Sequence, residues 1–324
     1  MGNLVSINDP QPYQSKEAER VRSELSDIMA ENGYNVVHLA RHLDVGRSTL
    51  QIFLCGTYSA PEEMAGRLGP GLASLKLRIA RKGKEPESDG EVFQTAALEM
   101  CQHVLEVCRV EGELGVAFGP AGVGKTFAIR AYVQGRDDTF LLEANESWGK
   151  FGALKVLAEM LELDPDRHSR LVLNDVVEAL ILKPRLVIVD EADLIPLPGL
   201  DVLRAIFDAC GGRMSLVLVG EPKLYHNMTR GRSGRANLRR LYSRVHICGR
   251  LPMPSEAEVR AYVKSRYPKA TDDAIKALAA EGETEGMRRV AKLLKGAAQV
   301  AQMNECELDA EVVEVAATRT MMIA

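Results

Sequence analysis

Residues 114–126, Leu-Gly-Val-Ala-Phe-Gly-Pro-Ala-Gly-Val-Gly-Lys-Thr, decide the fold class. The first five residues are an apolar run typical of a buried strand, and the last eight match the Gly-x-x-x-x-Gly-Lys-Thr pattern of a phosphate-binding P-loop. Glycines let backbone N–H groups turn toward phosphates, and the following helix N-terminus adds the positive end of its dipole. Strand, P-loop and helix in this order predict an α/β domain that binds a nucleotide.

Each position of this P-loop has an expected role. Lys125 is expected to reach the β- and γ-phosphates of ATP, and the Thr126 hydroxyl is expected to bind Mg²⁺. The predicted nucleotide-binding residues are Gly119, Pro120, Ala121, Gly122, Val123, Gly124, Lys125, Thr126 and Phe127. The predicted cofactors are therefore ATP and Mg²⁺.

A second apolar run, Leu-Val-Ile-Val at 186–189, is followed by two carboxylates, Asp190 and Glu191. Ligands of open α/β folds bind at the carboxyl ends of the strands, so we expect both side chains near the phosphates. Asp190 is expected to hold Mg²⁺, and Glu191 is expected to polarise the attacking water as a catalytic group. Alone, such a pair could be a strand end with solvated charges, but its place downstream of a P-loop favours the functional interpretation.

The remaining sequence predicts helices around a parallel sheet and additional helical parts. Strands are expected at 114–118, 138–143, 185–190, 214–220 and 245–248, alternating with helices such as one near 92–109. From residue 255 onward the pattern is purely helical, with helices expected at 255–266, 271–281, 285–302 and 309–319. This alternation predicts a parallel sheet with helices on both faces.

The N-terminal part of the chain predicts a separate all-α domain. Apolar positions at helical spacing on both sides of a turn with Gly46 predict a helix-turn-helix, and the charged, Gly- and Pro-punctuated residues 81–91 predict a linker. The predicted domains are a helix-turn-helix domain at 1–60, a helix and charged linker at 61–91, an α/β ATPase domain at 92–250 and a helical lid at 251–324.

The net charge, the cysteines and the apolar runs of the chain argue against several classes of protein. The net charge of −4 argues against a protein coated in positive charge, so any nucleic-acid surface must be local. The six cysteines form no Cys-x-x-Cys pair, which indicates neither a zinc site nor a disulfide framework. No apolar run approaches the ~20 residues that span a bilayer. We therefore expect a cytosolic protein without a membrane partner.

One segment, residues 222–255, lacks acidic residues altogether. Its basic residues are Lys223, Arg230, Arg232, Arg235, Arg239, Arg240, Arg244 and Arg250. Arginines of this kind can neutralise transition-state charge as a finger from a neighbouring subunit, pair with DNA phosphates, or form a solvated basic face. The residues alone leave these alternatives open.

Several stretches match one known family in order and spacing. They are the P-loop, Val-Ile-Val-Asp-Glu-Ala-Asp at 187–193, Leu-Val-Leu-Val-Gly at 216–220, Tyr-His-Asn-Met-Thr at 225–229 and Arg-Leu-Tyr-Ser-Arg-Val at 240–245. Together they resemble the Mu-type transposition B proteins, and the likeness includes the N-terminal helix-turn-helix and extends across most of the chain. The first two stretches are shared by many ATPases, whereas the last two are far more selective.

The resemblance implies a fold and an activity. The expected fold is an AAA+ parallel sheet with helices on both faces, an N-terminal all-α helix-turn-helix domain and a C-terminal helical lid. The expected protein is a DNA-stimulated ATPase of the host-cell cytosol that, with ATP bound, forms helical homo-oligomeric filaments on duplex DNA without strong sequence preference. It would deliver that target DNA to a DDE-type transposase, and ATP hydrolysis would release the filament.

The resemblance also implies roles for individual arginines. Arg244 fits the Ser-Arg arginine finger, with Arg240 as second choice, and Arg289 fits the nucleotide-sensing arginine of the lid. The sequence departs from the family where Glu221 replaces the polar amide expected as sensor, which puts the rate of hydrolysis in question. Glu221 either belongs to the site or points to the surface.

A second departure affects DNA contacts, because residues 251–256, Leu-Pro-Met-Pro-Ser-Glu, stand where the Mu protein carries a basic cluster. DNA contacts are therefore expected elsewhere in the chain. The candidates are Lys150, Lys155, Arg230, Arg232 and Arg235, with Arg47 and Gln51 in the predicted helix-turn-helix.

Two alternatives remain beside this interpretation. One is an AAA+ replication initiator or helicase loader, which shares the nucleotide motifs and differs in its partner. The other is a nucleotide-switched, sequence-specific DNA-binding regulator, which would need Arg47, Ser48, Thr49 and Gln51 to read base edges from the second helix of the predicted helix-turn-helix. A footprint with strong sequence preference would favour the regulator.

Overall fold

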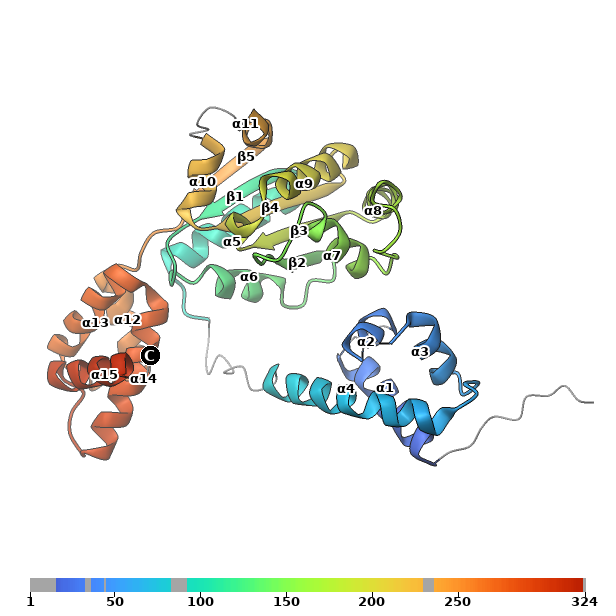
Figure 1. Ribbon diagram of the computed structural model, residues 1–324. Coiled ribbons are helices and arrows are strands. Elements are labelled where there is room, and N and C mark those ends of the chain that lie inside the picture. The colour runs from blue at the N-terminus through green and yellow to red at the C-terminus, as the bar shows by residue number, and fades with distance from the viewer. Residues whose placement is uncertain (1–15, 33–35, 44, 83–91, 230–235, 323–324) are drawn as a thin grey trace, which may run out of the picture. The chain divides into compact units, whose positions relative to one another are not determined.

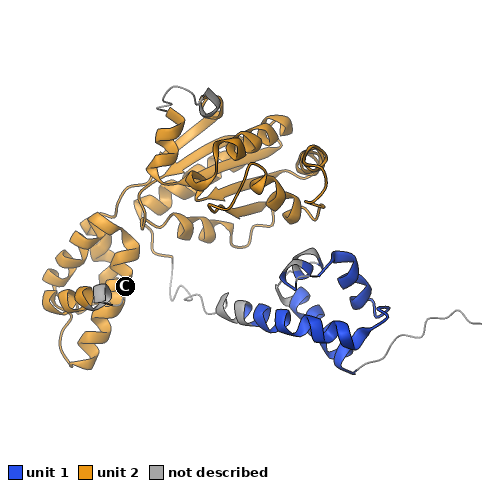
Figure 2. Cartoon of the chain, in the orientation of Figure 1, with its two compact units in different colours: residues 1–91 blue, residues 92–324 orange. Residues whose placement is uncertain are grey.

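The computed structural model describes residues 16–32, 36–43, 45–82, 92–229 and 236–322. It divides into two compact units, residues 1–91 and 92–324 (Figure 2). The division falls at the end of the predicted linker, of which residues 83–91 lie outside the described part of the chain.

The first unit is built from helices around an apolar core. Its helices are α1 (Lys16–Asn32), α2 (Val36–His42), α3 (Arg47–Leu54) and α4 (Pro61–Lys82). Leu25, Leu39, Leu50 and Phe53 are fully buried in this core. The helices α2 and α3 pack together, and Arg47 and Gln51 are exposed on α3. The use of this pair as a DNA-binding helix-turn-helix stays a prediction.

The second unit is centred on a five-stranded parallel sheet with the strand order β2-β3-β4-β1-β5 (Figure 1). The strands are β1 (Leu114–Phe118), β2 (Thr139–Glu143), β3 (Arg185–Asp190), β4 (Met214–Gly220) and β5 (Val245–Arg250). All four neighbouring pairs run parallel. The predicted α/β class and parallel sheet are confirmed.

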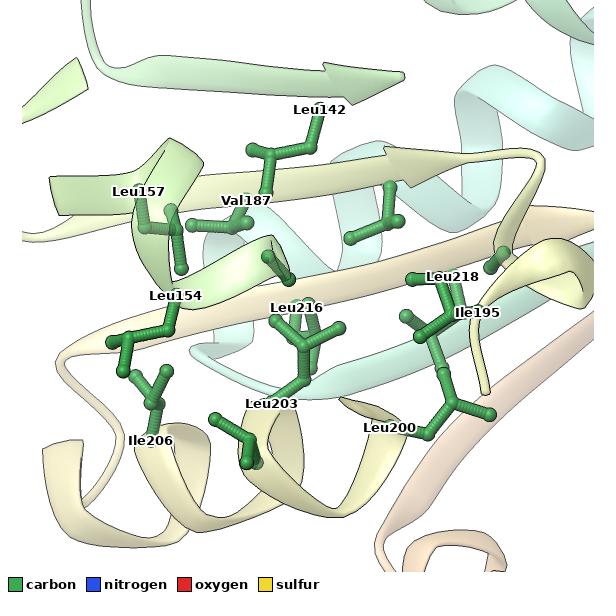
Figure 3. Close-up of a cluster of buried hydrophobic side chains, with 14 of the residues drawn as sticks. Leu142, Leu154, Leu157, Val187, Ile195, Leu200, Leu203, Ile206, Leu216 and Leu218 are labelled. Atoms are coloured by element: carbon green, nitrogen blue, oxygen red, sulfur yellow. The ribbon is translucent and has the colours of Figure 1, made fainter. Parts of the chain in front are cut away.

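Helices cover both faces of this sheet because successive side chains of a strand point to opposite faces. On β3, Val187 and Val189 join one core cluster, while Leu186 and Ile188 join the other. Figure 3 shows the first cluster, in which side chains of β2, β3 and β4 meet those of α7 and α9. Burial on both faces explains why the middle of β3 and most of β4 are apolar without alternation.

Helices precede and separate the strands of this domain, as the predicted alternation requires. They are α5 (Ala96–Glu111), α6 (Lys125–Val133), α7 (Gly152–Met160), α8 (Ser169–Leu182), the short 3₁₀ helix η1 (Ala192–Leu194), α9 (Leu197–Cys210), α10 (Pro222–Thr229) and α11 (Ala236–Tyr242). The helix expected from residue 92 begins later, because the Thr95 side chain caps it by accepting the Leu98 N–H at 3.2 Å.

The C-terminal helices form a bundle with a core of its own. They are α12 (Glu256–Arg266), α13 (Asp272–Glu285), α14 (Met287–Met303) and α15 (Ala310–Met322). A capping box between Ser255 and Glu258 starts α12. Among the described residues, no helix combines the length and apolar character that crossing a membrane requires.

Candidate nucleotide-binding site

The P-loop joins the end of β1 to the start of α6, as its sequence predicts. Gly122 and Gly124 adopt φ values of 81° and 101°, in the left-handed region that favours glycine. A side chain at Gly122 would also overlap the carbonyl oxygen of Glu285. These two glycines therefore permit a loop that exposes backbone N–H groups while lying directly against the lid.

Lys125 lies folded over the loop that precedes it. Its Nζ donates to the carbonyl oxygens of Gly119 and Pro120, both at 2.8 Å. Burial lowers the pKa of Lys125, and the carboxylates of Glu221, Asp190 and Asp193 act in the opposite direction. A phosphate group would give this ammonium an anionic partner in place of the two carbonyls.

Thr126 and Asp190 meet at the carboxyl edge of the sheet. The Thr126 hydroxyl donates to Asp190 Oδ2 at 2.7 Å, and Asp190 Oδ1 accepts the N–H of Glu191 at 2.9 Å. Asp190 is only 2% exposed. A hydroxyl and a carboxylate are hard oxygen donors, which suit Mg²⁺ when substrate phosphates supply further ligands. The donor set therefore fits the predicted metal.

Glu191 has an unusual backbone conformation, with φ 54° and ψ 35°. Residues other than glycine rarely occupy this left-handed region, and such conformations cluster at functional sites. The turn that follows is closed by the Leu194 N–H, which donates to the Glu191 carbonyl at 2.9 Å. The Glu191 side chain is exposed next to the buried Asp190, a placement that suits a group acting on water.

The end of β4 places Glu221 at the border of the site. Its backbone N–H donates to Asp193 Oδ1 at 2.9 Å, while its side chain is exposed. Among the charged groups that influence Lys125, Glu221 acts most strongly. The structure thus places Glu221 within electrostatic reach of the P-loop lysine, and its role in hydrolysis stays open to experiment.

The lid contributes its arginines at the start of α14. The Arg288 N–H donates to the Gly122 carbonyl at 3.1 Å, so this helix begins on the P-loop. The Arg289 side chain is 11% exposed and pairs through Nε with Glu281 at 2.9 Å. Its Nη2 is buried and has no hydrogen-bond partner among the described residues. Glu281 therefore holds the Arg289 guanidinium in place, while Nη2 can still donate a hydrogen bond.

Arg288 is a residue of this site that the sequence does not single out, although it influences Lys125 electrostatically. The signal in the sequence was the repeated arginine in Gly-Met-Arg-Arg at 286–289. Spacing alone could not tell which of the two neighbours faces the P-loop.

The proposed finger Arg244 lies at the other edge of the sheet. It precedes β5, whose first residue pairs with Leu114 at the start of β1, whereas the P-loop follows the end of β1. A strand of this length spans about 17 Å at ~3.3 Å per residue. The Arg244 guanidinium bonds to Asp208 of α9 and donates to the Arg240 carbonyl at 2.9 Å. Within one chain, Arg244 is thus separated from the P-loop.

The predicted DNA contacts are scattered over different parts of the chain. Lys150 is exposed, in the loop that follows β2, with its Nζ 5.0 Å from the ring centroid of Phe151. Lys155 on α7 already pairs with Asp166 at 3.1 Å. Arg240, which is predicted as the second choice for the arginine finger and not as a DNA contact, is exposed on α11. The three candidates Arg230, Arg232 and Arg235 lie outside the described residues.

Comparison with known proteins gives this geometry a family context. Residues 109–228 match the family model of an AAA domain. The chain is 24% identical over 273 residues to the Mu-like prophage FluMu DNA transposition protein B of Haemophilus influenzae, covering 83% of this chain and 92% of that protein. It is 23% identical over 245 residues to the ATP-dependent target DNA activator B of Escherichia phage Mu, covering 74% and 76%.

Among solved structures, RuvB of Thermotoga maritima aligns with 68% of this chain at a TM-score of 0.43 and 16% identity, covering 67% of that chain. The matched AAA domain contains the P-loop, Asp190, Glu191 and Glu221. The two relatives match well beyond that domain. The chain is a homologue of the Mu-type transposition B proteins, built around an AAA domain.

Proposed function

We propose that this protein hydrolyses ATP, assembles on duplex DNA as a helical homo-oligomer when ATP is bound, and delivers that DNA to a DDE-type transposase in the host-cell cytosol. The observation that carries the proposal is the meeting of Thr126, Asp190 and Glu191 beside Lys125 in a homologue of ATP-dependent target DNA activators. DNA is expected to stimulate hydrolysis.

Nucleotide binding rests on backbone and side-chain groups of one chain. The backbone N–H groups of residues 121–127 would surround the phosphates, and Lys125 would exchange its two carbonyl acceptors for phosphate oxygens. Thr126 and Asp190 would hold Mg²⁺, which supplies charge neutralisation at the phosphates when bound. The spare Nη2 of Arg289 offers a further donor from the lid.

Hydrolysis requires a water held in line with the terminal phosphate. Glu191 suits this role for two reasons. Its backbone N–H donates a hydrogen bond to the Asp190 carboxylate that would hold the metal, and its side chain is exposed. Arg244 would act on the phosphates of a neighbouring subunit, since it lies at the opposite edge of its own sheet. Assembly and hydrolysis would then depend on each other.

DNA binding is expected to rely on phosphate contacts from local basic groups. Lys150 is the best-placed described candidate in the second unit, because it is exposed and has no ion pair among the described residues, whereas Lys155 pairs with Asp166. Contacts of this kind release counterions and carry little sequence information. Binding without strong sequence preference follows from that chemistry.

The test is a fluorescence-anisotropy titration of the full chain on random and mixed-sequence duplexes with ATP, with ADP and without nucleotide. We expect tight DNA binding only when ATP is present, with equal affinity for both duplexes. The complex of protein, ATP and DNA should also bind the transposase. A preference of several hundredfold for one sequence would instead indicate a regulator, and capture of a replicative helicase in place of a transposase would indicate a loader.

A further inference from the structure

Asp193 makes a contact that none of the roles above uses. It lies in η1, the turn that begins directly after Glu191. Its Oδ1 accepts the backbone N–H of Glu221 at 2.9 Å. A Cβ atom built on Gly220 would lie 2.6 Å from the same oxygen, so the carboxylate is seated directly against the Gly220–Glu221 peptide.

The same peptide is held from the other side by the P-loop. The Gly119 N–H donates to the Gly220 carbonyl oxygen at 3.2 Å. The end of β4 is therefore bonded to the first residue of the P-loop and to the turn that carries Glu191. Three segments that are distant in sequence, at 119, 191–193 and 220–221, are joined at one point of the sheet edge.

We infer that Asp193 is a positioning residue for ATP hydrolysis, which fixes the end of β4 and the Glu221 carboxylate beside Lys125 and steadies the turn that presents Glu191. The inference rests on the proposed function. A carboxylate next to a polyphosphate is repelled by it, so Glu221 keeps its place only if its backbone is held. A hydrogen bond to an ionised acceptor is stronger than a neutral one, and Asp193 supplies such a bond.

The fit of Asp193 also accounts for the residue at position 220. A glycine there leaves room for the carboxylate, and its conformation lies outside the left-handed region, so backbone strain is not the reason for it. Alanine at this position would push the Asp193 carboxylate away without removing it. Gly220→Ala and Asp193→Ala should therefore have the same effect by different routes.

The kinetic test compares Asp193→Ala, Asp193→Asn and Gly220→Ala in the full chain with duplex DNA. Asparagine keeps a side-chain oxygen that can accept the Glu221 N–H. We expect kcat to fall about tenfold or more in the two alanine variants, while affinity for a fluorescent ATP analogue changes by less than about threefold. Asp193→Asn should keep most of the activity. Asp175→Ala on α8, which breaks an ion pair with Arg167, is the control.

The second measurement is hydrogen–deuterium exchange of a peptide containing Glu221, which needs no catalytic activity. Exchange should accelerate in both alanine variants and stay near wild type in Asp193→Asn. A folded Asp193→Ala protein with wild-type kcat, or an Asp193→Asn protein as impaired as Asp193→Ala, would overturn the inference. A loss of ATP affinity as large as the loss of kcat in Asp193→Ala would also overturn the inference. If the wild type binds ATP but never hydrolyses it, the proposed function fails, while the exchange data still decide whether Asp193 holds Glu221.

Discussion

At the carboxyl edge of the sheet, Lys125, Thr126, Asp190 and Glu191 of one chain already meet. At the amino edge, Arg244 is bonded to Asp208 of its own chain, which also pairs with Arg204 at 2.6 Å. The first region brings together the groups expected to hold a nucleotide, and the second holds a cation at the opposite edge of the sheet. From this contrast we expect nucleotide binding to need one chain only, whereas hydrolysis should need a neighbour.

Substitutions at the carboxyl edge should have the largest effects and should separate binding from hydrolysis. Lys125→Ala should abolish nucleotide binding, because it removes the half-buried cation of the P-loop. Glu191→Gln should keep binding and stop hydrolysis, because the amide cannot polarise water. Affinity for a fluorescent ATP analogue and phosphate release measure the two properties. Equal loss of affinity in both variants would show that Glu191 does not act on the water.

A substitution at the amino edge should stop hydrolysis without preventing binding. Arg244→Ala is expected to bind ATP nearly as the wild type does, yet to hydrolyse it ~10³–10⁵-fold more slowly and to form no filaments. The control is Arg204→Ala, which removes the other partner of Asp208 and leaves Arg244 in place. Normal turnover in Arg244→Ala would show that Arg244 is not the arginine finger, and Arg240 would be tested next.

The ion pair between Asp208 and Arg244 allows a further test of whether Arg244 acts on a neighbouring subunit. If the pair competes with use of Arg244 by a neighbour, Asp208→Asn should raise hydrolysis at low protein concentration by up to about fivefold, as expected for a surface ion pair. Asp201→Asn, which removes one of the two carboxylate partners of Arg204 and leaves Asp208 intact, serves as control. Reduced hydrolysis in Asp208→Asn alone would mean that Asp208 orients Arg244 rather than restraining it.

The smallest expected effect concerns DNA. Log affinity for duplex should fall with log salt by ~0.9 per phosphate contact, so Lys150→Ala should lower the slope by about one. Lys155→Ala should change the slope less, because Lys155 already pairs with Asp166. Anisotropy titrations at several salt concentrations measure both slopes. An unchanged slope in Lys150→Ala would remove this residue from the DNA surface.

The sequence predicts the sheet and the P-loop well because their signals are local. Continuous apolar runs define β3 and β4, and the glycines of the P-loop need conformations that few other residues adopt. The strand expected to end at 248 instead continues to Arg250, and the helix expected to end at 281 continues to Glu285.

Both differences have one physical reason, since a glycine follows each expected end and indicates a stop in the sequence. In the fold, Gly249 and Gly282 permit close packing instead. A Cβ atom on Gly249 would lie 2.7 Å from Val104, and one on Gly282 would lie 2.9 Å from Val290. Long-range pairs such as Arg244–Asp208 and Asp193–Glu221 leave no local signal, so the sequence alone could not predict them.

The central claim is that one subunit supplies the nucleotide site and its neighbour supplies Arg244. Mixing Lys125→Ala protein, which keeps Arg244, with Arg244→Ala protein, which keeps a sound P-loop, tests it most directly. We expect the mixture on duplex DNA to recover part of the ATPase activity that neither variant has alone. A mixture as inactive as its parts, with both proteins folded and assembled together on DNA, would contradict the claim.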